Sequence, residues 1–251
     1  KDHRANRITS YLNLLNELTQ KKFDEFIEST NEKFDEIQKY FSLLPNSSDL
    51  KAEFYNLIDG SFSYEELKKW LSENLTFGSI DVNIMTKVDK SNFFKNEELS
   101  VEYNDAHAAL RGYAMSDLAS SVIFSAGMNP RLYGYISNFD DFYPNETGYI
   151  KKKIVLKVSD YRSAIIQGKF LAKKGLWVSE YRIESGLNCG GHAFATDGLL
   201  MGPILSEFRD NKEELLKQTY EVLLPALVSA KRVIPKKNLS IKITAQGGVG
   251  T

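Results

Sequence analysis

Two adjacent glycines precede a histidine at Gly190-Gly191-His192, shortly after an apolar run at residues 178–184. Glycine lets the backbone approach a ligand closely because no Cβ intervenes. Histidine is the side chain best suited to proton transfer near neutral pH. We therefore predict that His192 is a catalytic residue and that Gly190 and Gly191 lie against its ligand. The alternative is that His192 only stabilises the glycine turn.

Cys189 lies three residues before His192, a spacing that occurs in metal-binding pairs. A structural zinc site needs about four ligands, and no second Cys/His pair lies nearby in the sequence. We therefore predict no metal site. Cys189 is a possible nucleophile, but small buried cysteines are usually inert.

Two polar residues interrupt other apolar runs. Asn83 is an amide within Val82-Asn83-Ile84-Met85, and Lys157 lies within the run at 153–159. A lysine inside a buried strand is costly unless its charge is paired or used. We predict that Lys157 faces an anionic ligand or a flavin ring; the alternative is a lysine that reaches solvent from a strand edge. Asn83 either contacts the same ligand or caps the strand end.

A glycine-rich segment, Gly247-Gly248-Val249-Gly250, follows the apolar run at residues 239–246. Backbone N–H groups in such a loop are available to a phosphate group. A plain turn with left-handed glycines is the alternative, since glycine loops of this kind are weak signals individually.

These residues follow or lie within short apolar runs that alternate with helical patterns. The predicted strands cover residues 80–85, 121–126, 153–159, 178–184 and 239–246, and the predicted helices cover 105–118, 161–174 and 212–232. Strands that alternate with helices indicate parallel βα units. The functional residues of such sheets gather beyond the carboxyl ends of the strands. Periodicity alone leaves open an open doubly wound sheet or a (β/α)₈ barrel.

Residues 1–75 differ from the rest because apolar residues recur there at helical spacing. Ser63 and Glu66 have the spacing of a capping box, which predicts a short helix through Leu75. We predict a helical insertion or subdomain at 1–75 and a separate α/β part at 76–251.

The composition excludes several classes of protein. Hydrophobic residues make up 42% and charged residues 26% of the 251 residues, as in a folded domain. The net charge of −1 gives no electrostatic case for nucleic acid or an acidic membrane as partner. The single cysteine excludes an internal disulfide and favours a cytoplasmic location. The chain starts at Lys1 and stops inside a glycine-rich loop, so we expect a piece of a longer protein.

The order of these motifs over residues 79–251 resembles the nitronate monooxygenase family of FMN-dependent TIM barrels, and also the related FMN-dependent enoyl-acyl-carrier-protein reductases. Members of both carry a strand that ends in Val-Asn, a Gly-Gly-His segment after a strand, and a later Gly-Gly loop. The resemblance implies an oxidoreductase that acts on a small organic substrate through the flavin N5, with His192 handling a proton. It also implies a set of FMN contacts: Asn83 and Lys157 at the ring, Gly190 and Gly191 beside it, and Gly247 and Gly248 at the phosphate.

The chain departs from the family pattern at several points. Asn188-Cys189 stands where the family has Glu-Ala, and Gln246 replaces the usual alanine before Gly247. The first two strands and the last strand of the barrel are not recognisable. We therefore expect an α/β fold with a parallel TIM-type (β/α) barrel that is incomplete in this chain. The alternatives are a non-redox phosphate-binding barrel and a non-enzymatic barrel fragment that acts as an interaction module.

Overall fold

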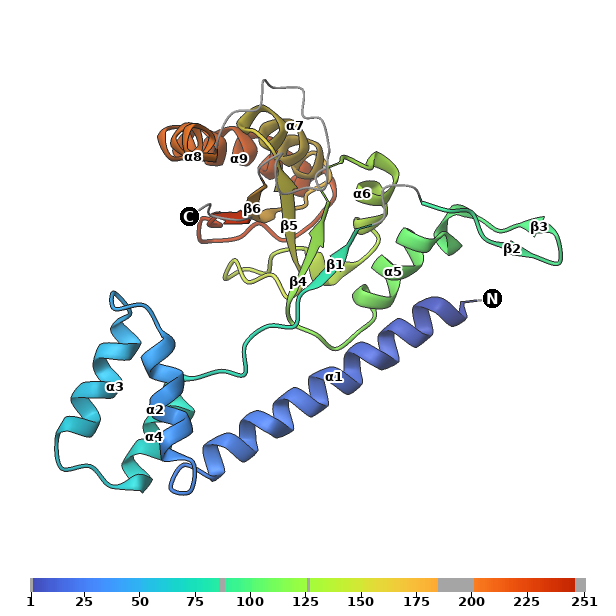
Figure 1. The fold of residues 1–251 in the computed structure, drawn as a ribbon. Coiled ribbons are helices and arrows are strands. Elements are labelled where there is room, and N and C mark those ends of the chain that lie inside the picture. Colours follow the sequence, from blue (N-terminus) through green and yellow to red (C-terminus); the bar gives the residue numbers. More distant parts are fainter. Residues whose placement is uncertain (1, 86–88, 126, 185–200, 247–251) are drawn as a thin grey trace. The chain divides into compact units, whose positions relative to one another are not determined.

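A computed structural model of the chain describes residues 2–85, 89–125, 127–184 and 201–246. The chain divides into two compact units, one of Asn13–Gly78 and one of Lys1–Leu12 with Ser79–Thr251. We describe each unit by itself (Figure 1). The predicted division, 1–75 and 76–251, differs in that it groups the first twelve residues with the helical part.

The unit of residues 13–78 is helical. Its core contains the stacked rings of Phe41 and Phe54, whose centroids lie 3.8 Å apart. The predicted capping box is confirmed, because the Ser63 hydroxyl accepts from the Glu66 N–H and the Glu66 carboxylate accepts from the Ser63 N–H. The helices of residues 2–78 are α1 (His3–Glu28), α2 (Phe34–Leu43), α3 (Asp49–Asp59) and α4 (Tyr64–Asn74).

The other unit contains a five-stranded parallel sheet with the strand order β1-β4-β5-β6-β7. The prediction of parallel βα units is therefore confirmed, and the five strands lie within the five predicted runs. In the described strands, spatial order follows chain order, without the reversal that marks a doubly wound sheet. The strands are β1 (Val82–Ile84), β4 (Ser121–Phe124), β5 (Lys153–Val158), β6 (Val178–Glu184) and β7 (Lys242–Gln246).

Helices cover one face of this sheet. Leu156 of β5 and Ile183 of β6 point into a core that also contains buried residues of every helix from α5 to α9. In Figure 1, α7, α8 and α9 lie near β5 and β6, and α5 and α6 lie nearer to β1. These helices are α5 (Asp105–Ala114), α6 (Pro130–Ile136), α7 (Tyr161–Ala172), α8 (Met201–Asp210) and α9 (Lys212–Ser229).

Short elements complete this unit. A two-stranded hairpin is formed by β2 (Phe93–Phe94) and β3 (Glu97–Glu98). Short 3₁₀ turns occur at Val101–Tyr103 and Asp140–Phe142. The hairpin, α6 and α8 are elements that the sequence analysis did not predict.

Candidate functional site

The face of the sheet opposite the helices is rich in polar side chains. In β5, Ile154, Leu156 and Val158 join the helix-covered core, so Lys157 points to the opposite side. In β1, Ile84 joins that core and Asn83 points away from it. We call this opposite side the polar face, and its polar residues include Asn83, Lys157, Glu180, Arg182, Glu184 and Thr244.

A shift of register in β6 places its charged residues on the polar face. Ile154 pairs with Val178, but the next residue, Val155, pairs with Glu180, so Ser179 has no partner in β5. An extra residue of this kind reverses which side chains face the core. Val178 therefore packs in the core, whereas Glu180 and the alternate residues that follow it face the other way.

Lys157 and Glu184 form a buried ion pair on this face. Lys157 Nζ lies 2.6 Å from Glu184 Oε1, and the two side chains are 6% and 9% exposed. β5 lies between β4 and β6, so Lys157 is not an edge lysine that reaches solvent. Each charge needs the other, because an unpaired charge at this depth is strongly destabilising. Both residues lie in the carboxyl-terminal halves of their strands.

Arg182 and Glu180 form a second ion pair beside the first. Arg182 Nε lies 2.8 Å from Glu180 Oε1, and the Thr244 hydroxyl donates to the same oxygen at 2.6 Å. Arg182 pairs in register with Lys157 on one side and with Thr244 on the other. The two cations thus sit side by side, and each has its own carboxylate.

Asn83 lies two strands away from Lys157 on the same face. It is exposed, and it pairs in register with Ile123, which pairs with Val155. Neighbouring strands lie about 4.8 Å apart and residues rise by about 3.3 Å along a strand, so Asn83 and Lys157 are separated by roughly 10 Å across the sheet and about 7 Å along it. A ligand on this face could contact both side chains.

The other predicted site residues fall outside the described part of the chain. They are Gly190, Gly191, His192, Gly247 and Gly248, together with Cys189. Over the residues that the structure describes, no group of three or more His, Cys, Asp or Glu side chains is placed to hold a metal ion.

A second polar cluster lies where the chain enters α5. The ring of His107 is 2% exposed, and its Nδ1 forms a short hydrogen bond with Asp89 Oδ2. The other oxygen of Asp89 accepts from the backbone N–H of Ala106 at 2.7 Å, at the first turn of the helix. The His107 ring packs against that of Tyr135 at 5.0 Å. These contacts anchor Asp89 and the His107 ring to the helix terminus.

The sequence analysis predicted Lys157 but missed its partner. A buried lysine is costly unless its charge is paired or hydrogen-bonded, and the alternating charges Glu180, Arg182 and Glu184 were a signal that β6 has one polar side. Thr244 carried no such signal.

Comparisons of this chain with protein-family models, with curated proteins and with solved structures found no match. Among the described residues, no helix has both the length and the apolar character that crossing a membrane requires.

Proposed function

We propose that the polar face is the inner wall of a flavin-binding (β/α) barrel, and that the protein is an FMN-dependent oxidoreductase that acts on a small organic substrate. Three features support the barrel. The strands of the five-stranded sheet are all parallel and follow chain order, the helices pack on one face of it, and the opposite face is polar. In a (β/α) barrel the helices lie outside and the ligand binds at the carboxyl ends of the strands.

The buried Lys157–Glu184 ion pair carries this proposal. It places a fixed cation in the carboxyl-terminal half of a central strand, where ligands of parallel α/β folds bind. An ammonium group has three N–H donors, so Lys157 retains donors for a ligand while it contacts Glu184. Glu184 holds the ammonium group in place and compensates its charge before the ligand arrives.

The described donors suit the ring of FMN. The pyrimidine edge of the ring presents hydrogen-bond acceptors, and a nearby cation stabilises negative charge there. Lys157 offers the cation, and the exposed amide of Asn83 offers both a donor and an acceptor on the same face. Bound FMN would supply electron transfer to or from the substrate at N5. From the family resemblance, the proposal also assigns the phosphate contacts to Gly247 and Gly248. It assigns proton transfer to His192.

Flavin binding by the full-length protein tests this function. The protein is purified under native conditions, and its flavin absorbance and fluorescence are recorded before and after FMN is added. We expect one FMN per chain. A protein that carries no flavin and takes up none contradicts the proposal. Catalytic activity without flavin would favour the non-redox barrel, in which Lys157 and His192 would act as acid and base.

A paired substitution separates binding from folding. Lys157→Met alone removes the cation beside the buried Glu184 carboxylate, so it weakens the fold as well as the site. The double variant Lys157→Met/Glu184→Leu removes both charges and is expected to keep the fold. We expect this double variant to bind FMN at least tenfold more weakly than the unmodified protein. Lys217→Met, at an exposed position of α9 that lines neither proposed site, should bind FMN normally.

A further inference from the structure

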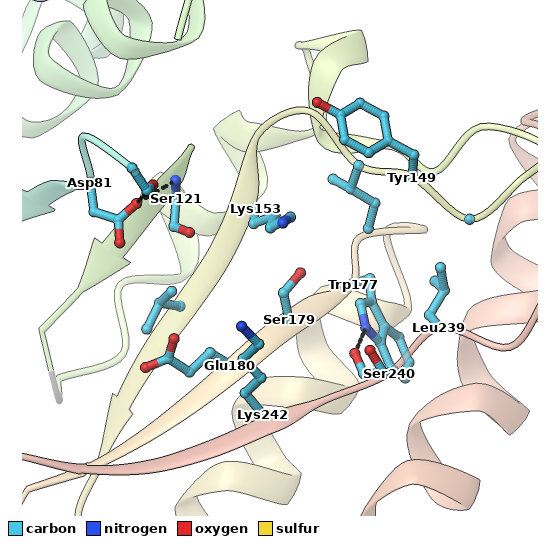
Figure 2. Close-up of a pocket in the computed structure, with 14 residues that line it drawn as sticks. Asp81, Ser121, Tyr149, Lys153, Trp177, Ser179, Glu180, Leu239, Ser240 and Lys242 are labelled. Carbon is cyan, nitrogen blue, oxygen red and sulfur yellow. Dashed lines mark hydrogen bonds between the residues drawn. The ribbon is translucent and has the colours of Figure 1, made fainter. Parts of the chain in front are cut away.

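A cavity of about 380 Å³ lies at the amino-terminal ends of the sheet strands, away from the Lys157–Glu184 pair (Figure 2). Its wall includes the first residues of three strands, Ser121 of β4, Lys153 of β5 and Lys242 of β7. Ser179 and Glu180, from the shifted segment of β6, complete this side. The volume lies within the range of about 300–1,000 Å³ that is typical of small-molecule sites.

The acidic groups of this cavity already have partners. Asp81 Oδ1 accepts from the Ser79 hydroxyl at 2.6 Å and from the Ser121 N–H at 3.0 Å. Glu180 is paired with Arg182 and accepts from Thr244. Because both carboxylates already accept hydrogen bonds, the cavity does not favour a cationic ligand. In Figure 2, Asp81 lies at one end of the cavity, well apart from Lys242.

The two lysines of the cavity have no such partners. Over the described residues, neither Lys153 nor Lys242 takes part in an ion pair. The strands that carry them flank β6, so their backbones lie roughly 10 Å apart and both side chains can reach one group between them. Figure 2 shows the Ser179 side chain directed toward Lys153, where its hydroxyl can add a neutral donor.

The wall also has an apolar and aromatic part. Trp177 and Leu239 line the cavity beside Val155, and Trp177 is fixed by a hydrogen bond of 3.0 Å from its Nε1 to the Ser240 carbonyl. Tyr149 also lines it, although the side chain is 52% exposed. An exposed aromatic ring at the rim of a cavity can stack on a planar ligand.

The turn that carries Tyr149 is tightly organised. Asn145 Oδ1 accepts from the backbone N–H groups of Thr147 and Tyr149 at 3.0 and 2.9 Å, and the Asn145 N–H donates to the Tyr149 carbonyl at 2.9 Å. Gly148 has a φ of 84°, which other residues rarely adopt. The backbone that carries the Tyr149 ring is thus fixed at the rim.

From these observations we propose that the cavity binds a small organic phosphate. The phosphate contacts Lys153 and Lys242, and the planar organic group lies against Tyr149 and Trp177. Two unpaired cations match a dianion better than a carboxylate, and the mixture of apolar wall and convergent polar groups is typical of ligand sites. This site is separate from the proposed flavin site, because it lies at the opposite ends of the strands.

Calorimetric titration with phenyl phosphate tests the site, with inorganic phosphate and benzoate as comparisons. We expect phenyl phosphate to bind more tightly than either, and more weakly as salt is raised. Lys153→Met and Lys242→Met should each weaken binding about tenfold, since a charged hydrogen bond contributes on that scale. Tyr149→Ser should bring the affinity for phenyl phosphate close to that for inorganic phosphate.

Lys217→Met is the matched control, because Lys217 is an exposed lysine on α9 that does not line the cavity. It should leave binding unchanged, and thermal melting should show that all variants are folded. The proposal is overturned if phenyl phosphate does not bind, or if the double variant Lys153→Met/Lys242→Met binds it normally. If benzoate binds as tightly as phenyl phosphate, the site does not select a dianion and the proposal is wrong on that point. If inorganic phosphate binds as tightly as phenyl phosphate, the proposed contact with the organic group is wrong.

Discussion

Lys157 Nζ and Glu184 Oε1 lie 2.6 Å apart in a pair that is almost inaccessible to solvent. The residues come from adjacent parallel strands, and the shift of register at Ser179 determines that Glu184 faces the same way as Lys157. A buried ion pair contributes little net stability, but loss of one partner is costly. The pair therefore fixes a charged group at the carboxyl-terminal side of the sheet, where a ligand can use it.

We predict a non-additive effect on stability when this pair is removed. Lys157→Met should lower the free energy of unfolding by roughly 3–5 kcal/mol, because it leaves the Glu184 carboxylate buried without its cation. Lys157→Met/Glu184→Leu should recover most of that loss. Urea unfolding of the two variants measures both values. Lys153→Met should change stability by less than about 0.5 kcal/mol, since Lys153 is exposed; equal losses in the single and double variants would contradict the account.

We predict that the free energy of unfolding rises at alkaline pH because of Lys152. Its ammonium group is fully buried and donates to the carbonyls of Ser116 and Leu118 at 2.8 and 2.9 Å. Burial lowers the pKa of Lys152 from 10.5 to about 8. Between pH 8 and 10.5 the unfolded chain therefore binds more protons than the folded protein, and stability increases with pH. Below pH 8 both states are protonated and this contribution is constant.

The increase should reach about 2 kcal/mol between pH 7.5 and 9.5, since one pKa unit corresponds to 1.36 kcal/mol. Urea unfolding at several pH values measures it. Lys152→Met should flatten the profile, although it also destabilises the protein at every pH by leaving two carbonyls without a donor. Lys217→Met, at an exposed lysine on α9, should keep the slope. A wild-type profile that is flat over this range would show that the folded and unfolded states do not differ in the pKa of Lys152.

Gly168 marks the closest approach of α7 to the sheet. A Cβ at this position would meet Tyr181 Oη inside van der Waals distance and Thr219 Cγ2 at 3.2 Å. Tyr181 is 1% exposed and cannot move aside easily. Gly168→Ala should therefore destabilise the protein by about 1–2 kcal/mol, because overpacking outweighs the gain of about 1 kcal/mol in helix propensity.

Gly202 is the matched control for this substitution, because it also lies in a helix, α8, and a Cβ there would meet no atom within 4 Å. Gly202→Ala should leave stability unchanged or raise it by up to about 1 kcal/mol. Thermal melting compares the two variants. A Gly168→Ala protein that melts at or above the wild-type temperature would show that α7 does not depend on this close contact.

The sequence predicted the positions of the strands because each is a short run with β-branched residues between helical patterns. It predicted the helix that begins after Ser63 because a capping box is a local signal. It missed α6, although Asn129 caps that helix and Pro130 occupies its first turn. Those residues are typical of a helix start.

The hairpin and the ion pairs were harder to predict for physical reasons. The turn between β2 and β3 uses Lys95 and Asn96 with φ values of 49° and 65°, a conformation that is usually marked by glycine. The partner of Lys157 depends on register across two strands, and an unpaired Ser179 in β6 sets that register. No local pattern encodes such a shift.

FMN titration of the full-length protein, with flavin fluorescence as the signal, tests the proposed function most directly. We predict saturable binding of one FMN per chain, at least tenfold weaker in Lys157→Met/Glu184→Leu and unchanged in Lys217→Met. Absence of binding by the unmodified protein would contradict the proposed function. Equal binding by all three folded proteins would show that Lys157 and Glu184 do not contribute to the flavin site.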